Sequence, residues 1–136
     1  MTFDRKYLLC SLVFAVIGMC IGIYMAASQN HGEFIAHAHI LLVGFVVSFV
    51  YGLIHKLWIA AEGATISTVQ FFLHQAAVIV MGTGLLTWYG GVQPPVLENI
   101  LAASSIGVLI AALLMVYMVF RYPKQGAAPT VAASRA

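Results

Sequence analysis

Two histidines two positions apart, His37 and His39, are the residues of this chain best placed to do chemistry. They lie within an apolar run from Phe34 to Trp58 that is long enough to cross a bilayer. Ionisable side chains are costly at membrane depth, so their presence there predicts a functional role. Because a helix turns by about 100° per residue, positions i and i+2 point to nearly opposite sides. We therefore expect His37 and His39 to serve two different partners.

Haem iron is the partner that suits this geometry. A six-coordinate haem takes one axial imidazole on each face of the macrocycle, and the two ligands come from different helices. If His37 and His39 face different neighbours, a ring of identical subunits completes every such pair. The spacing therefore predicts a haem, which we expect to be of the b type, between His37 of one subunit and His39 of the next. The alternative is that both are packing histidines with hydrogen-bonded partners.

The remaining histidines are spread over the depth of the membrane. At about 1.5 Å per residue, His55 lies about 27 Å from His37, so the two cannot serve one metal ion. His39 and His74 are expected to differ in depth by about 12 Å. They should therefore not face each other across a small cofactor within one subunit.

Each of these histidines has more than one interpretation. His74 is a further candidate for cofactor binding, with a lone histidine bonded to a backbone carbonyl as the equal alternative. His55 is expected at the membrane interface, and a metal or quinone site shared with His74 is the alternative. His31 and Glu33 are expected in solvent, although with His37 they could gather copper or zinc at the outer surface.

Helices that cross a membrane must position these side chains. Of 136 residues, 62% are hydrophobic and 7% are charged, and mean hydropathy is +1.01. Soluble proteins average about a quarter charged residues. Four apolar segments, at residues 7–27, 34–58, 69–89 and 97–120, approach the roughly 20 residues that a spanning helix needs. Their short links predict an all-α, antiparallel four-helix unit in the membrane.

The chain divides into one membrane domain and a tail. Residues 1–122 are expected to form the four-helix transmembrane domain, and residues 123–136 a flexible C-terminal tail. All six Lys and Arg fall on one side of this topology, so the positive-inside rule predicts that both termini are cytoplasmic. The net charge of +2 reflects this topology and not nucleic-acid binding. The lipid bilayer and further copies of the chain are the expected partners.

Small residues mark places where helix backbones can approach closely. Gly18 and Gly22 form a GxxxG pair in the first span, and Gly82, Gly84 and Gly107 follow in later spans. Such residues predict close helix contacts. Packing within one four-helix unit and packing between subunits both remain open.

The segment FIAHAHIL, residues 34–41, resembles the haem-ligating helices of subunit I of the haem-copper oxidase superfamily. The similarity is greatest to the tenth helix, where a His-x-His pair serves two haems. Residues 44–55 and 71–74 resemble small four-helix bacterial proteins grouped with that superfamily, described as cytochrome c oxidase subunit I-like. The oxidase subunit has twelve helices in three arcs of four, with a ligand-bearing helix second in each arc. The resemblance implies that this chain is similar to one arc, that three copies form a homotrimer, and that its membrane is a bacterial-type inner membrane.

Missing motifs separate the chain from the oxidases. It has no His-Pro-Glu segment and no adjacent His-His pair, which are the copper-site motifs of that family, so we expect no oxygen reduction. A bis-histidine iron also lacks an open position for oxygen, which favours electron transfer to or from a redox protein or a quinone. The sequence predicts an electron carrier more than a terminal oxidase and leaves enzymatic turnover open. The alternatives are a module that binds or transports copper, another metal or haem, and a non-redox assembly subunit of a respiratory complex.

Overall fold

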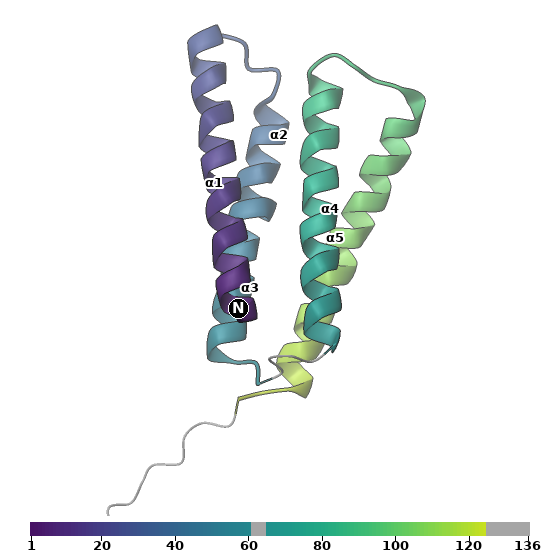
Figure 1. Ribbon diagram of the computed structural model, residues 1–136. Helices are drawn as coiled ribbons and strands as arrows, with labels where there is room; N and C mark the ends of the chain where they lie inside the picture. Colours follow the sequence, from purple (N-terminus) through teal and green to yellow (C-terminus); the bar gives the residue numbers. More distant parts are fainter. Residues whose placement is uncertain (61–64, 125–136) are drawn as a thin grey trace, which may run out of the picture.

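Four membrane-length helical spans make up the computed structural model, which describes residues 1–60 and 65–124 (Figure 1). The spans are α1 (Phe3–Ser28), a second span (Phe34–Leu57), α4 (Thr65–Tyr89) and α5 (Pro95–Arg121). Each is long and apolar enough to cross a membrane, which confirms the prediction of an all-α chain with four helices of membrane-spanning length. α1 and α4 begin at residues 3 and 65, earlier than the expected 7 and 69, because a helix continues past its apolar run into the polar interface.

The second span is not a uniform α-helix, although the sequence predicted one. It consists of α2 (Phe34–His39), a π-helical segment η1 (Ile40–Val47) and α3 (Ser48–Leu57). The i→i+5 bonding of a π-helix makes its turns wider than those of an α-helix. Side chains after residue 47 are therefore rotated relative to their places on a regular helix that continues α2.

Local chemistry ends the helices where the chain must turn. Gln29 follows α1 in the left-handed conformation, at φ 55°, which is a common way to stop a helix. Gly91 has φ 95° in the link between α4 and α5, a conformation that glycine adopts without a steric penalty. Pro95 then opens α5, where its missing N–H removes no helical hydrogen bond.

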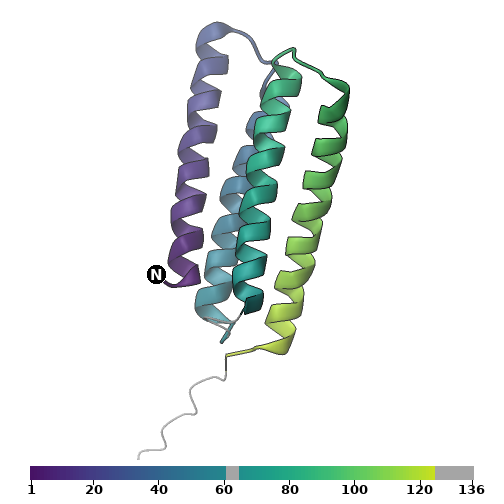
Figure 2. The same cartoon turned by 45° about the vertical axis from the view of Figure 1, so that its right-hand side comes forward.

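The spans pair into two helical hairpins (Figures 1 and 2). α1 packs along the second span, and α4 packs along α5. The hairpins meet mainly through α4, which contacts α2 and η1, whereas α1 and α5 make no extensive contact within the described residues. Only 17% of the most apolar stretch of α1 and of α5 is buried, against 50% for α4. α1 and α5 therefore form two apolar flanks.

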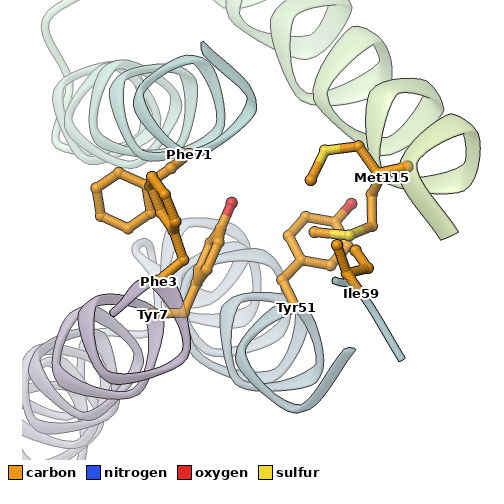
Figure 3. Packing of buried hydrophobic residues seen from close by; sticks show 7 residues of the cluster. Phe3, Tyr7, Tyr51, Ile59, Phe71 and Met115 are labelled. Atoms are coloured by element: carbon orange, nitrogen blue, oxygen red, sulfur yellow. The ribbon is translucent and has the colours of Figure 1, made fainter. Parts of the chain in front are cut away.

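An aromatic and sulfur-rich core packs between the helices near the start of α1 (Figure 3). Tyr7 of α1 meets Phe71 of α4 edge to face at 4.8 Å between ring centroids. The cluster also includes Phe3, Tyr51, Ile59, Met115 and Met118. A short bridge closes this end of the molecule, with the Ala60 N–H donating to the Tyr122 carbonyl at 2.9 Å.

The GxxxG glycines serve packing within the chain. A Cβ at Gly18 would collide with Leu41, and a Cβ at Gly22 would lie 3.1 Å from Cε1 of His37. The later glycines likewise face residues of the same chain, namely Gly82 against Ile40, Gly84 against Leu101 and Gly107 against Ala77. Of the two alternatives, packing inside one four-helix unit accounts for these positions.

Every described Lys and Arg lies at the end of the molecule where α1 begins and α5 ends. This agrees with the one-sided distribution on which the predicted topology rests. The predicted flexible tail falls almost entirely on residues 125–136, which lie outside the described part of the chain.

Candidate functional site

His37 and His39 emerge on either side of the buried edge of α2. That edge is formed by Ala36, which is 0% exposed, and Ile40, which is 4% exposed. At about 100° per residue, each histidine lies about 80° from the middle of this edge, in opposite directions. Both side chains are half-buried. The arrangement keeps the two imidazoles apart, as their spacing predicted.

Each imidazole is anchored through Nδ1 to a backbone carbonyl. His37 Nδ1 lies 2.9 Å from the Gly18 oxygen on α1, and His39 Nδ1 lies 2.8 Å from the Ile35 oxygen on its own helix. A carbonyl oxygen can only accept, so a neutral ring in this position carries its proton on Nδ1. The lone pair is then on Nε2, the atom through which a histidine oriented in this way binds a metal.

Neither Nε2 atom has a hydrogen-bond partner among residues 1–60 and 65–124. The packing alternative expected one hydrogen-bonded polar partner for each histidine, and each ring has one, at Nδ1. The Nε2 atom of each ring remains as an acceptor. Gly22 gives the His37 ring its room, since a Cβ at residue 22 would meet that ring at 3.1 Å. The π-helical segment starts directly after His39, and such segments occur often at functional sites.

The outer-surface metal site is not assembled. His31 is exposed in the first link. Glu33 lies instead against the end of α4, with Oε1 3.2 Å from the place of a Cβ on Gly90. No three His, Cys, Asp or Glu side chains among the described residues gather closely enough to hold a metal ion. The idea that His31, Glu33 and His37 share an ion is therefore wrong for this fold.

His74 lies in a separate buried polar cluster. Its Nε2 is 3.0 Å from the Ser48 hydroxyl, and the Gln75 amide donates to the same hydroxyl at 3.4 Å. His74 is fully buried. Ser48 is nine positions after His39, which corresponds to about 13 Å along the helix. His74 is therefore well separated in depth from His39, as expected, and is bonded to a side-chain hydroxyl and not to a backbone carbonyl.

His55 is enclosed in the aromatic core near the end of α3. It is 0% exposed, because it stacks on Phe3 at 5.5 Å and on Tyr7 at 5.6 Å. Both ring nitrogens are buried without a hydrogen-bond partner in the described part of the chain. Tyr7 also lies against His74 at 6.1 Å, so the two histidines share a tyrosine neighbour.

Tyr7 and Gln70 form a second buried polar contact beside His74, and neither residue was singled out as a candidate from the sequence. The Tyr7 hydroxyl donates to Oε1 of Gln70 at 2.5 Å, and the Gln70 amide donates to the Ala111 carbonyl at 3.3 Å. An uncharged glutamine within an apolar span was the available signal. This chain of bonds joins α1, α4 and α5.

No protein-family model, no curated protein and no solved structure matches this chain. The function of the site is therefore argued from the arrangement of its own residues.

Proposed function

We propose that this protein binds haem in the membrane through His37 of one copy and His39 of the next, and that it carries electrons. One observation carries the proposal: both imidazoles are held through Nδ1 by carbonyl oxygens at 2.9 and 2.8 Å. Each Nε2 then presents a lone pair in a fixed orientation, which is the form that ligates haem iron. The residues thus fit a bis-histidine haem.

Two copies are needed for each haem because the imidazoles of one chain leave α2 in opposite directions. Iron needs one imidazole on each face of the porphyrin, and rings about 160° apart on one helix cannot supply both. A closed ring of copies supplies every site with one His37 and one His39. The apolar flanks α1 and α5, each with 17% of the most apolar stretch buried, leave surface for such contacts. We propose a trimer, following the similarity to one four-helix arc.

In this assembly the residues of the chain bind and orient. The Gly18 carbonyl fixes the plane of the His37 ring, and the Ile35 carbonyl fixes that of His39. Carbonyl bonding also raises the basicity of each imidazole as a ligand. Haem held by His37 and His39 would supply one-electron redox chemistry, which suits electron transfer and not oxygen reduction. The redox partner is a protein or a quinone. By the positive-inside rule, the basic end of the molecule faces the cytoplasm.

The metal-carrier alternative lacks a comparable site. A copper or zinc ion bound by the protein alone takes three or more side-chain ligands. Within residues 1–60 and 65–124, no such group is present. No described contact favours a purely structural assembly subunit over a haem protein.

Absorption spectroscopy tests the proposal. Full-length protein produced with a haem supply should show a Soret band and, after dithionite reduction, the sharp bands of low-spin haem. His37→Ala and His39→Ala should each lose this spectrum. His31→Ala is the matched control, because His31 is exposed and belongs to no ligand group, and it should keep the spectrum. A colourless wild-type protein, or colour that survives both alanine variants, would refute the proposal.

A further inference from the structure

A groove between α1 and α3 opens at the basic end of the molecule. Its volume is about 480 Å³. One wall comes from the first turns of α1 and the other from one face of α3, and the residues used below are Asp4, Arg5, Leu8, Phe49, Leu53 and Lys56. None of these residues belongs to the proposed haem site.

Polarity changes along the groove. Arg5 and Lys56, both exposed, stand at the end of the molecule. Leu8, Phe49 and Leu53 line the deeper part and are 41%, 37% and 39% exposed. Seven positions separate Lys56 from Phe49, or about 10 Å along α3. The groove thus passes from charged groups at the membrane surface to apolar side chains within the hydrocarbon.

Gly52 closes the back of the groove. A Cβ at residue 52 would lie 3.2 Å from the Asp4 carbonyl oxygen and 3.2 Å from Cβ of Tyr7. α1 and α3 therefore touch behind the groove, and an occupant can enter only from the surface or from the surrounding lipid.

The groove carries an excess of positive charge. Arg5 and Lys56 contribute two cations, and Asp4 contributes one carboxylate, whose Oδ1 atom is buried. Further basic residues at the same end, Lys6, Arg121 and Lys124, add to the positive field. Basic residues at a membrane surface attract anionic lipid headgroups.

We propose that this groove binds an anionic phospholipid. The phosphate would lie between Arg5 and Lys56, and the upper part of the acyl chains would lie against Leu8, Phe49 and Leu53. The surface cations and the apolar depth match the two halves of a phospholipid, whereas a free phosphate would use only the first. A second copy of the chain would be expected to present an apolar surface and would leave both cations unused.

Lipid retention in matched variants tests this site. Delipidated full-length protein in detergent is titrated with phosphatidylglycerol or phosphatidylcholine, and bound lipid is counted by native mass spectrometry. Wild type should prefer phosphatidylglycerol. The double variant Arg5→Gln/Lys56→Gln should bind phosphatidylglycerol about tenfold more weakly. The control Lys6→Gln/Arg121→Gln removes the same charge outside the groove and should change phosphatidylglycerol binding less than about twofold. If the groove variant does not fold, Arg5→Gln and Lys6→Gln give the same comparison, with an expected loss of about threefold for the former.

Several results would overturn the assignment. Equal losses in the two double variants would mean general attraction by the basic end. Competition by inorganic phosphate alone at the same concentration would mean a free-anion site. A change in oligomer mass with unchanged lipid binding would mean that a second copy covers the groove. Each outcome is independent of whether haem is bound.

Discussion

A hydrogen bond at one nitrogen decides what the other nitrogen of a histidine can do. In His37 and His39 the carbonyl partners at 2.9 and 2.8 Å hold the proton on Nδ1 and leave Nε2 as the acceptor. The same bonds fix the ring planes, so the direction of each candidate ligand is set within the chain itself. The Nδ1 partners are therefore part of the site.

Gly22→Ala probes the orientation of His37 without touching its chemistry. The added Cβ would lie 3.1 Å from Cε1 of the ring, so the imidazole must move by a few tenths of an ångström. We expect haem affinity to fall about tenfold while the helical circular dichroism spectrum is kept, since disturbing the contacts that orient a metal-binding histidine costs about 10- to 100-fold in affinity. Affinity is measured by haem titration.

Gly107→Ala is the control for this substitution. Its new Cβ would lie at the same 3.1 Å, but from Cβ of Ala77, far from either candidate ligand. Equal effects of the two substitutions on haem affinity would show that packing, and not the orientation of His37, is responsible.

Tyr7→Phe tests the buried polar cluster. The change keeps the ring contacts of Tyr7 with Phe71 and His55 but removes the donor to Gln70 Oε1. Hydrogen bonds between membrane helices contribute about 0.6 kcal/mol on average and up to about 1.7 kcal/mol. We expect unfolding free energy in mixed detergent to fall by about 1 kcal/mol. Tyr24→Phe, at a site that is 57% exposed, should change it little, and equal losses would argue against the cluster.

Among the elements, η1 stands out because it interrupts the span that carries both candidate ligands. A π-helical turn accommodates one more residue than an α-helical turn. The wide segment at residues 40–47 therefore lets α2 and α3 each keep their own register toward their neighbours. α2 thereby directs His37 toward α1, while α3 directs Ser48 toward His74.

Deletion of Leu42 tests this description of η1. Leu42 is 60% exposed, and its removal should turn the wide segment into ordinary α-helix with the flanking registers unchanged. The protein should then keep its helix content and its thermal midpoint within a few degrees. Deletion of Leu109, which is 58% exposed in the regular helix α5, should rotate one half of that helix by about 100° and cause unfolding. Equal losses of helix content and thermal midpoint in both deletion variants would contradict the assignment of η1 as a segment with one extra residue.

The sequence predicted the helical spans better than the side-chain contacts between them. Four spans were predictable because a run of about twenty apolar residues is typical of a membrane-spanning helix. The opposed directions of His37 and His39 follow from helix geometry alone. The segment ILLVGFVV contains nothing to distinguish a π-helix from an α-helix. The partners of His74 and the burial of His55 depend on how neighbouring helices are rotated about their axes. The hydrophobic pattern does not determine this rotation in spans that are apolar on every face. Glu33 was misplaced for a similar reason, because its contact at Gly90 lies 57 positions away in the chain.

On the scale of the whole molecule, a single chain leaves much apolar surface uncovered. α4 is half buried, whereas most of the apolar surface of α1 and α5 faces outward. Lipid can cover such surfaces, but a ring of copies would also bring His37 and His39 of different chains together. If haem lies between copies, assembly and haem binding depend on each other, and loss of one should accompany loss of the other.

Mixed assemblies of two inactive variants provide the most direct test. His37→Ala keeps His39, and His39→Ala keeps His37. A trimer made of either variant alone has no complete pair of ligands. A trimer that contains both has one interface in three with His37 on one side and His39 on the other.

The measurement is the reduced-minus-oxidised haem spectrum of the two variants coexpressed in equal amounts. With random mixing, we expect recovery of about one quarter of the wild-type low-spin haem, from a baseline near zero for each variant alone. Native mass spectrometry of the same sample should place the recovered haem on trimers that contain both variants. Baseline haem in those mixed trimers, or full haem in either variant alone, would contradict the claim that neighbouring copies share each haem.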